Sequence, residues 1–203
     1  MHLKIKASRF SCYSLRSNNS TKNTPLSFQV IAALCIIERY VVKLENCIWC
    51  GFESEILNAP THKYMESSAG CWSSYGEVLE REYSNADYFV VHALTVDAFA
   101  LQHPGIENPQ TISSVNVHLA SLFSYFELGT PLDKLSHVRK LYVQHKESFI
   151  WLKPPRDLTS ITTTNILMAK SAIEHHELVK NWARYIFEQW HKHHHVVAKL
   201  LCI

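Results

Sequence analysis

From Cys71 onward, apolar residues recur at the three- and four-residue steps of amphipathic helices, and this periodicity limits the fold more than any other feature. Capping residues, prolines and glycines divide the region into segments. The predicted helices run from Cys71 to Tyr83, from Asn85 to His103, from 109 to 127, from Thr130 to Tyr142, and from Thr159 and Ala172 toward the C-terminus. The last stripe is too long for one helix, so a break is predicted near residues 190–193. Five glycines and seven prolines in 203 residues disfavour a turn-rich all-β fold. We therefore predict a mainly α fold, a helical bundle.

The region before Cys71 has a different character. Residues 1–24 carry five basic residues and no acidic one, which predicts a disordered basic arm over 1–25; an organelle transit peptide and a wrongly chosen start codon are the alternatives. Residues 26–44 form a plausible apolar helix, so residues 26–203 are predicted to make a single helical domain. The longest apolar run, 30–37, is far shorter than the ~20 residues of a membrane span.

Charge and cysteine usage narrow the class of protein. The net charge of +2 is too small to indicate nucleic-acid binding, and it leaves a protein partner open. Six unevenly spaced cysteines do not suit a secreted disulfide framework in a chain of this length. A reducing compartment with thiolate–metal chemistry fits better, so a cytoplasmic location is predicted.

Residues 45–70 are irregular and offer few periodic apolar positions with which to build a core. Within them, Cys47-Ile48-Trp49-Cys50-Gly51 is a C-x-x-C knuckle, whose two thiolates can grip one tetrahedral ion. Cys71 is the obvious third ligand and His62 the best fourth, giving the order C-x2-C-x11-H-x8-C. The sequence therefore predicts a Zn²⁺ site on an N-terminal zinc-knuckle segment, residues 45–71. A reduced pair of surface thiols and a redox pair are the alternatives.

A second group of polar residues lies in the predicted helices. His92 and His103 share one helical face but stand ~16 Å apart along the axis, too far to bind one ion. The helix over 109–127 should fold back antiparallel and bring His118 close to Asp97. The resulting set of His92, Asp97, His103 and His118 is the candidate catalytic group. An Asp97–His118 pair is equally a common way to satisfy two polar groups in a core.

The remaining histidines lie toward the C-terminus. His176 is on the apolar stripe and is predicted to face the Asp97 region. His193 to His195 are interpreted as a solvated helix end, where histidine is favoured by the negative end of the helix dipole.

Two stretches, Cys71 to Leu79 (CWSSYGEVL) and Val91 to Gly105 (VHALTVDAFALQHPG), together with the C-x-x-C, resemble a bacterial family known as domain of unknown function 5946. The resemblance covers roughly residues 45–195. It implies no activity, because the family has none assigned. It does imply that seven residues occupy recurring positions of the family: Cys47, Cys50, Cys71, His92, Asp97, His103 and His118. Thr61-His62-Lys63-Tyr64 also fits the H-x-Y that follows the knuckle.

Three functions follow from these patterns. The first is a structural zinc module in a binding or regulatory protein, whose four protein ligands close the site. The second is a metal-dependent hydrolase-like enzyme in which the His/Asp group lines a pocket around activated water. The third is a thiol redox or metal-sensing protein that uses Cys47 and Cys50 reversibly.

Overall fold

A computed structural model describes residues 43–159 and 161–201. The predicted arm over 1–25, and all but the last two residues of the helix predicted over 26–44, lie outside this range. Lys43 and Leu44 are not helical: Leu44 begins a strand. The proposed domain limits therefore stay a prediction. The described residues belong to one compact unit.

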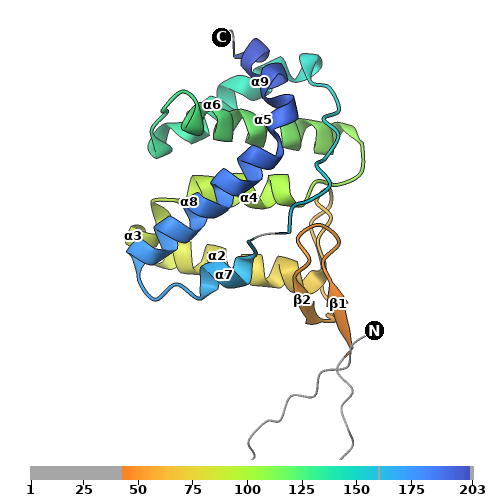
Figure 1. Cartoon of the computed structure of the whole chain (residues 1–203), viewed down its shortest axis with the longest axis vertical. Coiled ribbons are helices and arrows are strands. Elements are labelled where there is room, and N and C mark those ends of the chain that lie inside the picture. The colour runs from red at the N-terminus through yellow and green to blue at the C-terminus, as the bar shows by residue number, and fades with distance from the viewer. Residues whose placement is uncertain (1–42, 160, 202–203) are drawn as a thin grey trace, which may run out of the picture. The chain divides into compact units, whose positions relative to one another are not determined.

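The fold is mainly α, as predicted (Figure 1). The α-helices of the described residues are α2 (Ala69–Ser84), α3 (Ala86–Phe89), α4 (His92–Gln102), α5 (Pro109–Phe126), α6 (Leu135–Tyr142), α7 (Thr163–Leu167), α8 (Ala172–Gln189) and α9 (His194–Leu200). Three 3₁₀ turns join them: η1 (Leu132–Lys134), η2 (Val143–Ser148) and η3 (His191–His193). Among these helices, none combines the length and the apolar character needed to cross a membrane.

The stretch predicted to be irregular contains a small hairpin. Strands β1 (Leu44–Asn46) and β2 (Glu53–Glu55) pair antiparallel, with Glu45 opposite Ser54. The loop between them is the C-x-x-C knuckle itself. The hairpin packs against the start of α2.

Helix α4 is the centre of the bundle. It packs against α5 on one side and α8 on another, and α2 lies alongside it (Figure 1). Its residues from Leu94 to Gln102, Val96 excepted, are buried. Because the helix is enclosed, every polar side chain that it carries must find a partner inside the protein. Thr95, Asp97, Gln102 and His103, at its end, are all buried in this way.

Several predicted boundaries are confirmed by the capping contacts. The Asn108 side chain accepts hydrogen bonds from the backbone N–H groups of Gln110 and Thr111, with Pro109 in the first turn of α5. The predicted break in the last stripe falls at Trp190, between α8 and η3.

Two boundaries were predicted wrongly. Asn85 caps only the short α3, and the chain leaves helical geometry at Val91 before α4 begins, so residues 85–103 are not one helix. Val91 is buried while Val90 is exposed, and no proline or glycine marks this break in the sequence. Thr159 caps no helix: it hydrogen-bonds Asp157, and Thr162 forms the capping box of α7 with Asn165.

Candidate metal centre

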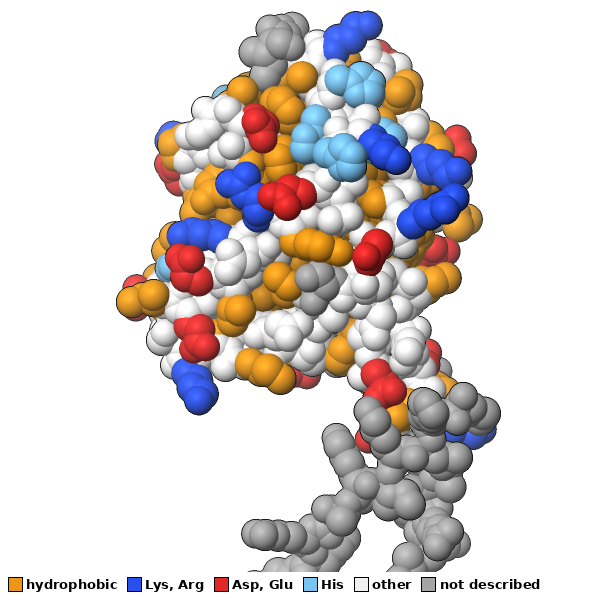
Figure 2. All heavy atoms as spheres, in the orientation of Figure 1, with side chains coloured by type: hydrophobic (Ala, Val, Ile, Leu, Met, Phe, Trp, Pro, Cys, Tyr) orange, Lys and Arg blue, Asp and Glu red, His pale blue; other side chains and the backbone are white. Residues whose placement is uncertain are grey.

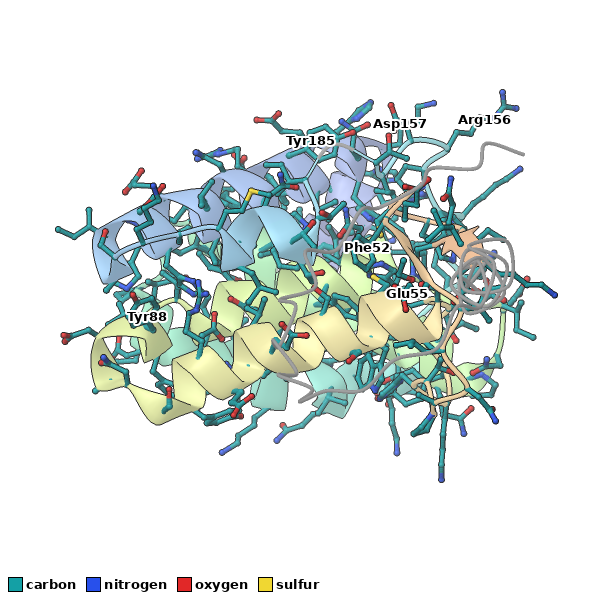
Figure 3. All side chains as sticks on the ribbon, turned by 90° about the horizontal axis from the view of Figure 1, so that it is seen from below. Phe52, Glu55, Tyr88, Arg156, Asp157 and Tyr185 are labelled. Atoms are coloured by element: carbon teal, nitrogen blue, oxygen red, sulfur yellow. The ribbon has the colours of Figure 1, made fainter. Side chains whose placement is uncertain are left out.

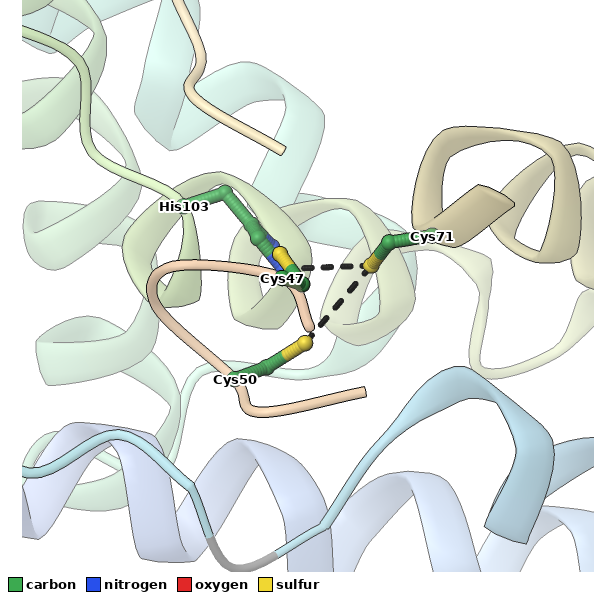
Figure 4. A group of neighbouring side chains, drawn as sticks. All are labelled: Cys47, Cys50, Cys71 and His103. Atoms are coloured by element: carbon green, nitrogen blue, oxygen red, sulfur yellow. Dashed lines mark hydrogen bonds between the residues drawn. The ribbon is translucent and has the colours of Figure 1, made fainter. Parts of the chain in front are cut away.

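Four buried side chains converge at the hairpin loop: Cys47, Cys50, Cys71 and His103 (Figure 4). One ligand atom from each lies within 4.8 Å of all the others. The Sγ atoms of Cys50 and Cys71 are 3.6 Å apart, and Cys71 Sγ is 3.3 Å from His103 Nε2. The three thiols are not joined in a disulfide. This group, called the cysteine centre below, could hold a metal ion.

The hairpin loop presents its two sulfurs by a tight turn. The Cys47 N–H donates to the Phe52 carbonyl at 2.8 Å, and the Gly51 N–H donates to the Cys47 carbonyl at 2.9 Å. Gly51 has φ of 71°, in the left-handed region that favours glycine. The turn therefore folds Cys47 and Cys50 toward the same side.

Cys71 lies in the first turn of α2, as predicted. Its backbone N–H donates to the Ser68 hydroxyl at 3.1 Å, which caps the helix. The positive end of the helix dipole at this turn favours a negative charge on the sulfur.

His103 comes from the far end of α4, where the helix stops. Its Nδ1–H donates to the Phe99 carbonyl at 3.0 Å, so its Nε2 is left as the lone-pair donor that faces the sulfurs. The ring also stacks on Phe99, with centroids 4.1 Å apart, and Phe99 stacks on Tyr75 at 3.8 Å. The imidazole is thus held in orientation, with Nε2 directed at the sulfurs.

In the cysteine centre, the pKa of each thiol is shifted mainly by its hydrogen bonds with the other thiols. Hydrogen bonds from Cys50 and then Cys71 lower the pKa of Cys47, so its thiolate is the favoured anion. The hydrogen bond with Cys47 raises the pKa of Cys50 to about 12, and the hydrogen bonds with Cys47 and Cys50 raise that of Cys71. The three thiols therefore do not ionise independently of one another. A cation between them would let all three ionise.

The spacing also suits the size of zinc. Zinc–sulfur bonds of ~2.3 Å in a tetrahedron place sulfurs roughly 3.8 Å apart, and the corresponding sulfur–nitrogen separation is slightly shorter. The 3.6 Å and 3.3 Å separations of the cysteine centre are close to these values. Three thiolates and one imidazole are a ligand set that zinc takes in closed sites.

The fourth position of the centre holds His103, whereas the sequence pattern had indicated His62. His62 lies outside the group: its ring packs against Tyr64 and Trp72 at 4.3 Å and 5.2 Å. Burial lowers its pKa, so it sits neutral among aromatic rings. His62 was chosen because it is close to the cysteines in sequence. His103 is close to them only because the end of α4 packs beneath the hairpin loop.

The four candidate catalytic residues do not line one pocket. His103 belongs to the cysteine centre, while Asp97 and His118 form the predicted pair, with His118 Nδ1–H donating to Asp97 at 2.7 Å. Ser121 and Arg139 also bond this carboxylate, and we call the four residues the Asp97 centre. Its carboxylate has a partner on each oxygen, the arrangement of a satisfied buried group.

His92 belongs to a third cluster, centred on the buried Glu82. His92 Nδ1 lies 2.8 Å and His175 Nε2 lies 3.0 Å from its carboxylate oxygens, and the Thr95 hydroxyl donates to it as well. Sequence reasoning missed Glu82. The available signal was its position on the apolar face of α2, seven residues after Tyr75, where a charged side chain must be buried.

The C-terminal histidines differ in part from their predicted roles. His176 does not face Asp97: its Nε2–H donates to the Asp87 carbonyl at 2.6 Å, and it is His175 that turns inward. His195 is exposed as predicted, whereas His193 and His194 are half-buried and bond the carbonyls of Lys153 and Phe187. His193 therefore joins η3 to the chain before α7, and His194 bonds back to the last turn of α8.

The fold and this site define a small helical protein with a buried Cys₃His group suited to a metal ion. The chain belongs to the family of unknown function DUF5946, whose model matches residues 45–191. The match begins at the hairpin and ends just after α8, so it contains the whole cysteine centre. No curated protein and no solved structure gives a significant match to this chain.

Proposed function

We propose that Cys47, Cys50, Cys71 and His103 hold one structural Zn²⁺ ion, in a helical module that binds or regulates another protein. The observation that carries this proposal is the closed donor set: four buried ligand atoms within 4.8 Å of one another, contributed by three separate parts of the chain. When bound, the ion would supply the positive charge that lets the sulfurs ionise. It would also join the hairpin to α2 and α4.

A structural role is favoured over catalysis by the number and burial of the donors. Four protein ligands complete a tetrahedral site and leave no open position for water or substrate, as a catalytic zinc requires. The hydrolase hypothesis also needed one pocket lined by His92, Asp97, His103 and His118. These residues lie in three different clusters.

A role in protein binding is supported by the surface beside the centre. The knuckle residue Ile48 is 78% exposed, and Ile106, three residues after His103, is 69% exposed. Ile56 and Leu57, just after the hairpin, are exposed too. Ile48 and Ile106 line the same cavity, and exposed apolar side chains that lie together are typical of protein contacts. Three thiolates that stay reduced also suit the cytoplasm.

Elemental analysis of the purified full chain tests the proposal. We expect one zinc per chain, lost in Cys71→Ser and in His103→Ala and retained in the matched control His62→Ala. Loss of zinc in His62→Ala with retention in His103→Ala would overturn the ligand set. A protein purified without metal that takes up none when zinc is added would overturn the proposal itself.

The redox hypothesis makes a different prediction for the same protein. It requires a disulfide among the knuckle thiols that forms and reduces reversibly while the fold persists. Zinc binding protects thiols, so the structural hypothesis expects slow labelling of Cys47, Cys50 and Cys71 by a thiol reagent until a chelator is added. Rapid labelling of zinc-loaded protein would favour the redox hypothesis.

A further inference from the structure

A second site lies at the C-terminal end of α8 and shares no residue with the cysteine centre. A cavity of about 600 Å³ opens between the connector 151–158 and the turn that joins α8 to α9. Lys153, Pro154, Pro155 and Arg156 line it from the connector, and Lys192 and His193 from η3. The family resemblance and the proposed zinc centre leave this cavity unexplained.

The cavity is strongly basic for its size. Among the described residues, Lys153, Arg156 and Lys192 have no carboxylate partner within ion-pair distance. Asp157 is the single acidic residue of the lining. Figure 2 shows histidine, lysine and arginine side chains gathered over this end of the molecule. Three cations and one carboxylate give this lining a net charge of +2, as much as the whole chain carries, within one small part of the surface.

The walls of the cavity are held in place. Leu152 and Leu158, both buried, anchor the connector at its two ends, and adjacent prolines stiffen the chain between them. His193 Nε2–H donates to the Lys153 carbonyl at 2.9 Å, which ties the connector to η3. On the opposite wall, His191 Nδ1–H donates to the Glu188 carbonyl at 2.8 Å. The backbone that carries the three exposed cations is therefore held in place, which reduces the entropy cost of ordering the chain around a ligand.

We propose that this cavity binds an organic phosphate of nucleotide size. A guanidinium and two ammonium groups from opposite walls suit a phosphate group, which offers several charged oxygens at once. The cavity is larger than an inorganic ion needs and falls within the roughly 300–1,000 Å³ range of small-molecule sites. The apolar faces of Pro154 and Pro155 can pack against a ring, and the Gln189 amide can bond its polar edge.

Calorimetric titration of the zinc-loaded full chain with adenosine diphosphate tests the proposal, with adenosine and inorganic phosphate as parallel probes. We expect binding of the diphosphate that weakens at higher salt, as charge-dominated binding does. We expect both parallel probes to bind more weakly. In nuclear magnetic resonance spectra, the diphosphate should shift signals of residues 153–157 and 189–193. Equal affinity for adenosine would overturn the phosphate assignment, and equal affinity for inorganic phosphate would overturn the organic part.

A matched pair of triple variants separates this site from general surface charge. Lys153→Gln/Arg156→Gln/Lys192→Gln should bind the diphosphate at least about tenfold more weakly. The control Lys134→Gln/Lys140→Gln/Lys170→Gln removes the same charge from exposed positions outside the cavity and should bind like the wild type. Circular dichroism checks that both variants fold. Equal affinity of the two variants, or no binding of the diphosphate at millimolar concentration, would overturn the proposal.

Discussion

The cysteine centre and the Asp97 centre are both buried polar clusters built on α4, but they differ in where their positive charge comes from. At the Asp97 centre, Arg139 Nη1 lies 3.0 Å from each carboxylate oxygen, so the chain supplies its own cation. At the cysteine centre the group consists of three sulfurs and an imidazole, with no guanidinium or ammonium group among the four residues. The first cluster is complete as folded. The second needs an ion from solution before its sulfurs can all ionise.

Because of this difference, we expect the two parts of the molecule to respond differently to the loss of a bound metal. The Asp97 centre joins α4, α5 and α6 through side chains alone. The cysteine centre joins a hairpin that has little core of its own to α2 and α4. We therefore expect the hairpin to depend on metal and the helices to be largely independent of it.

The largest effect is expected from Cys71→Ser, which removes the sulfur that lies within hydrogen-bond distance of both Cys50 and His103. The variant should lose its metal and most of the hydrogen-exchange protection of residues 43–68, because structural zinc contributes on the order of 10 kcal/mol in small zinc domains. Protection in α4, α5 and α8 should remain. Hydrogen exchange with mass spectrometry measures both regions in one experiment.

Chelation of zinc from the wild-type chain is the control for this variant and should give the same pattern. If the hairpin stays protected after the metal is gone, the hairpin does not depend on the ion. If the helices lose protection together with the hairpin, the two centres belong to one cooperative unit and the contrast fails.

The next effect should come from Arg139→Met, which leaves the buried Asp97 carboxylate without its cation. A buried ion pair that loses one partner costs about 3 kcal/mol or more, and we expect a loss of about 3 kcal/mol in the free energy of unfolding. Urea denaturation measures it, with Arg184→Met as the control because Arg184 is exposed. Zinc content should not change.

A double-mutant cycle sharpens this result. If the Arg139 effect arises from the unpaired carboxylate, Asp97→Asn should remove much of it, so that the double variant is less destabilised than the two single variants predict. Simple additivity would show that Arg139 stabilises the fold through packing and not through Asp97.

Glu82 is an intermediate case, since its partners are hydrogen-bond donors without a permanent charge. Burial opposes ionisation of this carboxyl, but its hydrogen bonds with His175, His92 and Thr95 outweigh burial and lower its pKa below 4.5. Glu82 therefore stabilises the fold fully above pH 4.5, and this contribution is lost as the pH falls below that value through the lowered pKa.

Glu82→Gln should accordingly cost about 2 kcal/mol at pH 7, the value of hydrogen bonds to a charged group. The difference from the wild type should shrink as the pH falls below 4.5. Denaturation at pH 7 and at a pH below 4.5 measures this difference in the free energy of unfolding. Glu80→Gln, at an exposed position on the same helix, is the control. A difference that grows in acid would contradict the assigned direction of the shift.

The smallest effect concerns backbone packing beside the cysteine centre. A Cβ on Gly105, two residues after His103, would lie 2.3 Å from the Tyr64 carbonyl oxygen, which cannot move aside easily. Gly105→Ala should cost about 1.5 kcal/mol, as overpacking does, and weaken zinc retention against a competing chelator. Gly76→Ala is the control, because a Cβ there meets nothing within 4 Å and alanine favours the helix. Unchanged zinc retention in Gly105→Ala would show that the centre tolerates movement of this segment.

Much of the fold could be predicted because the signals were local. The helix starts at Asn108-Pro109 and the break at Trp190 depend on neighbouring residues, and the structure confirms both. The Asp97–His118 pair could also be predicted, since a short loop between two helices forces them to lie antiparallel. The break at Val91 could not be predicted, because residues 85–103 contain neither proline nor glycine to indicate it.

The cysteine centre, too, could be predicted only in the part that depends on residues close together in the sequence. Three sulfurs could be grouped from the sequence because Cys47, Cys50 and Cys71 bracket one irregular segment. The imidazole that lies with them belongs to His103, 32 residues beyond Cys71, and no spacing rule selects it over His62.

The sequence by itself determined the helical class, most helix ends, the family, and the grouping of the three sulfurs. All of these depend on residues close together along the chain. Only the tertiary structure decided which histidine joins the sulfurs and why the other His and Asp candidates lie apart. The reason is that α4 is enclosed by its neighbours, so each polar residue along it is matched to whichever helix or loop faces it there. Figure 3 shows the side chains that fill the space between the helices.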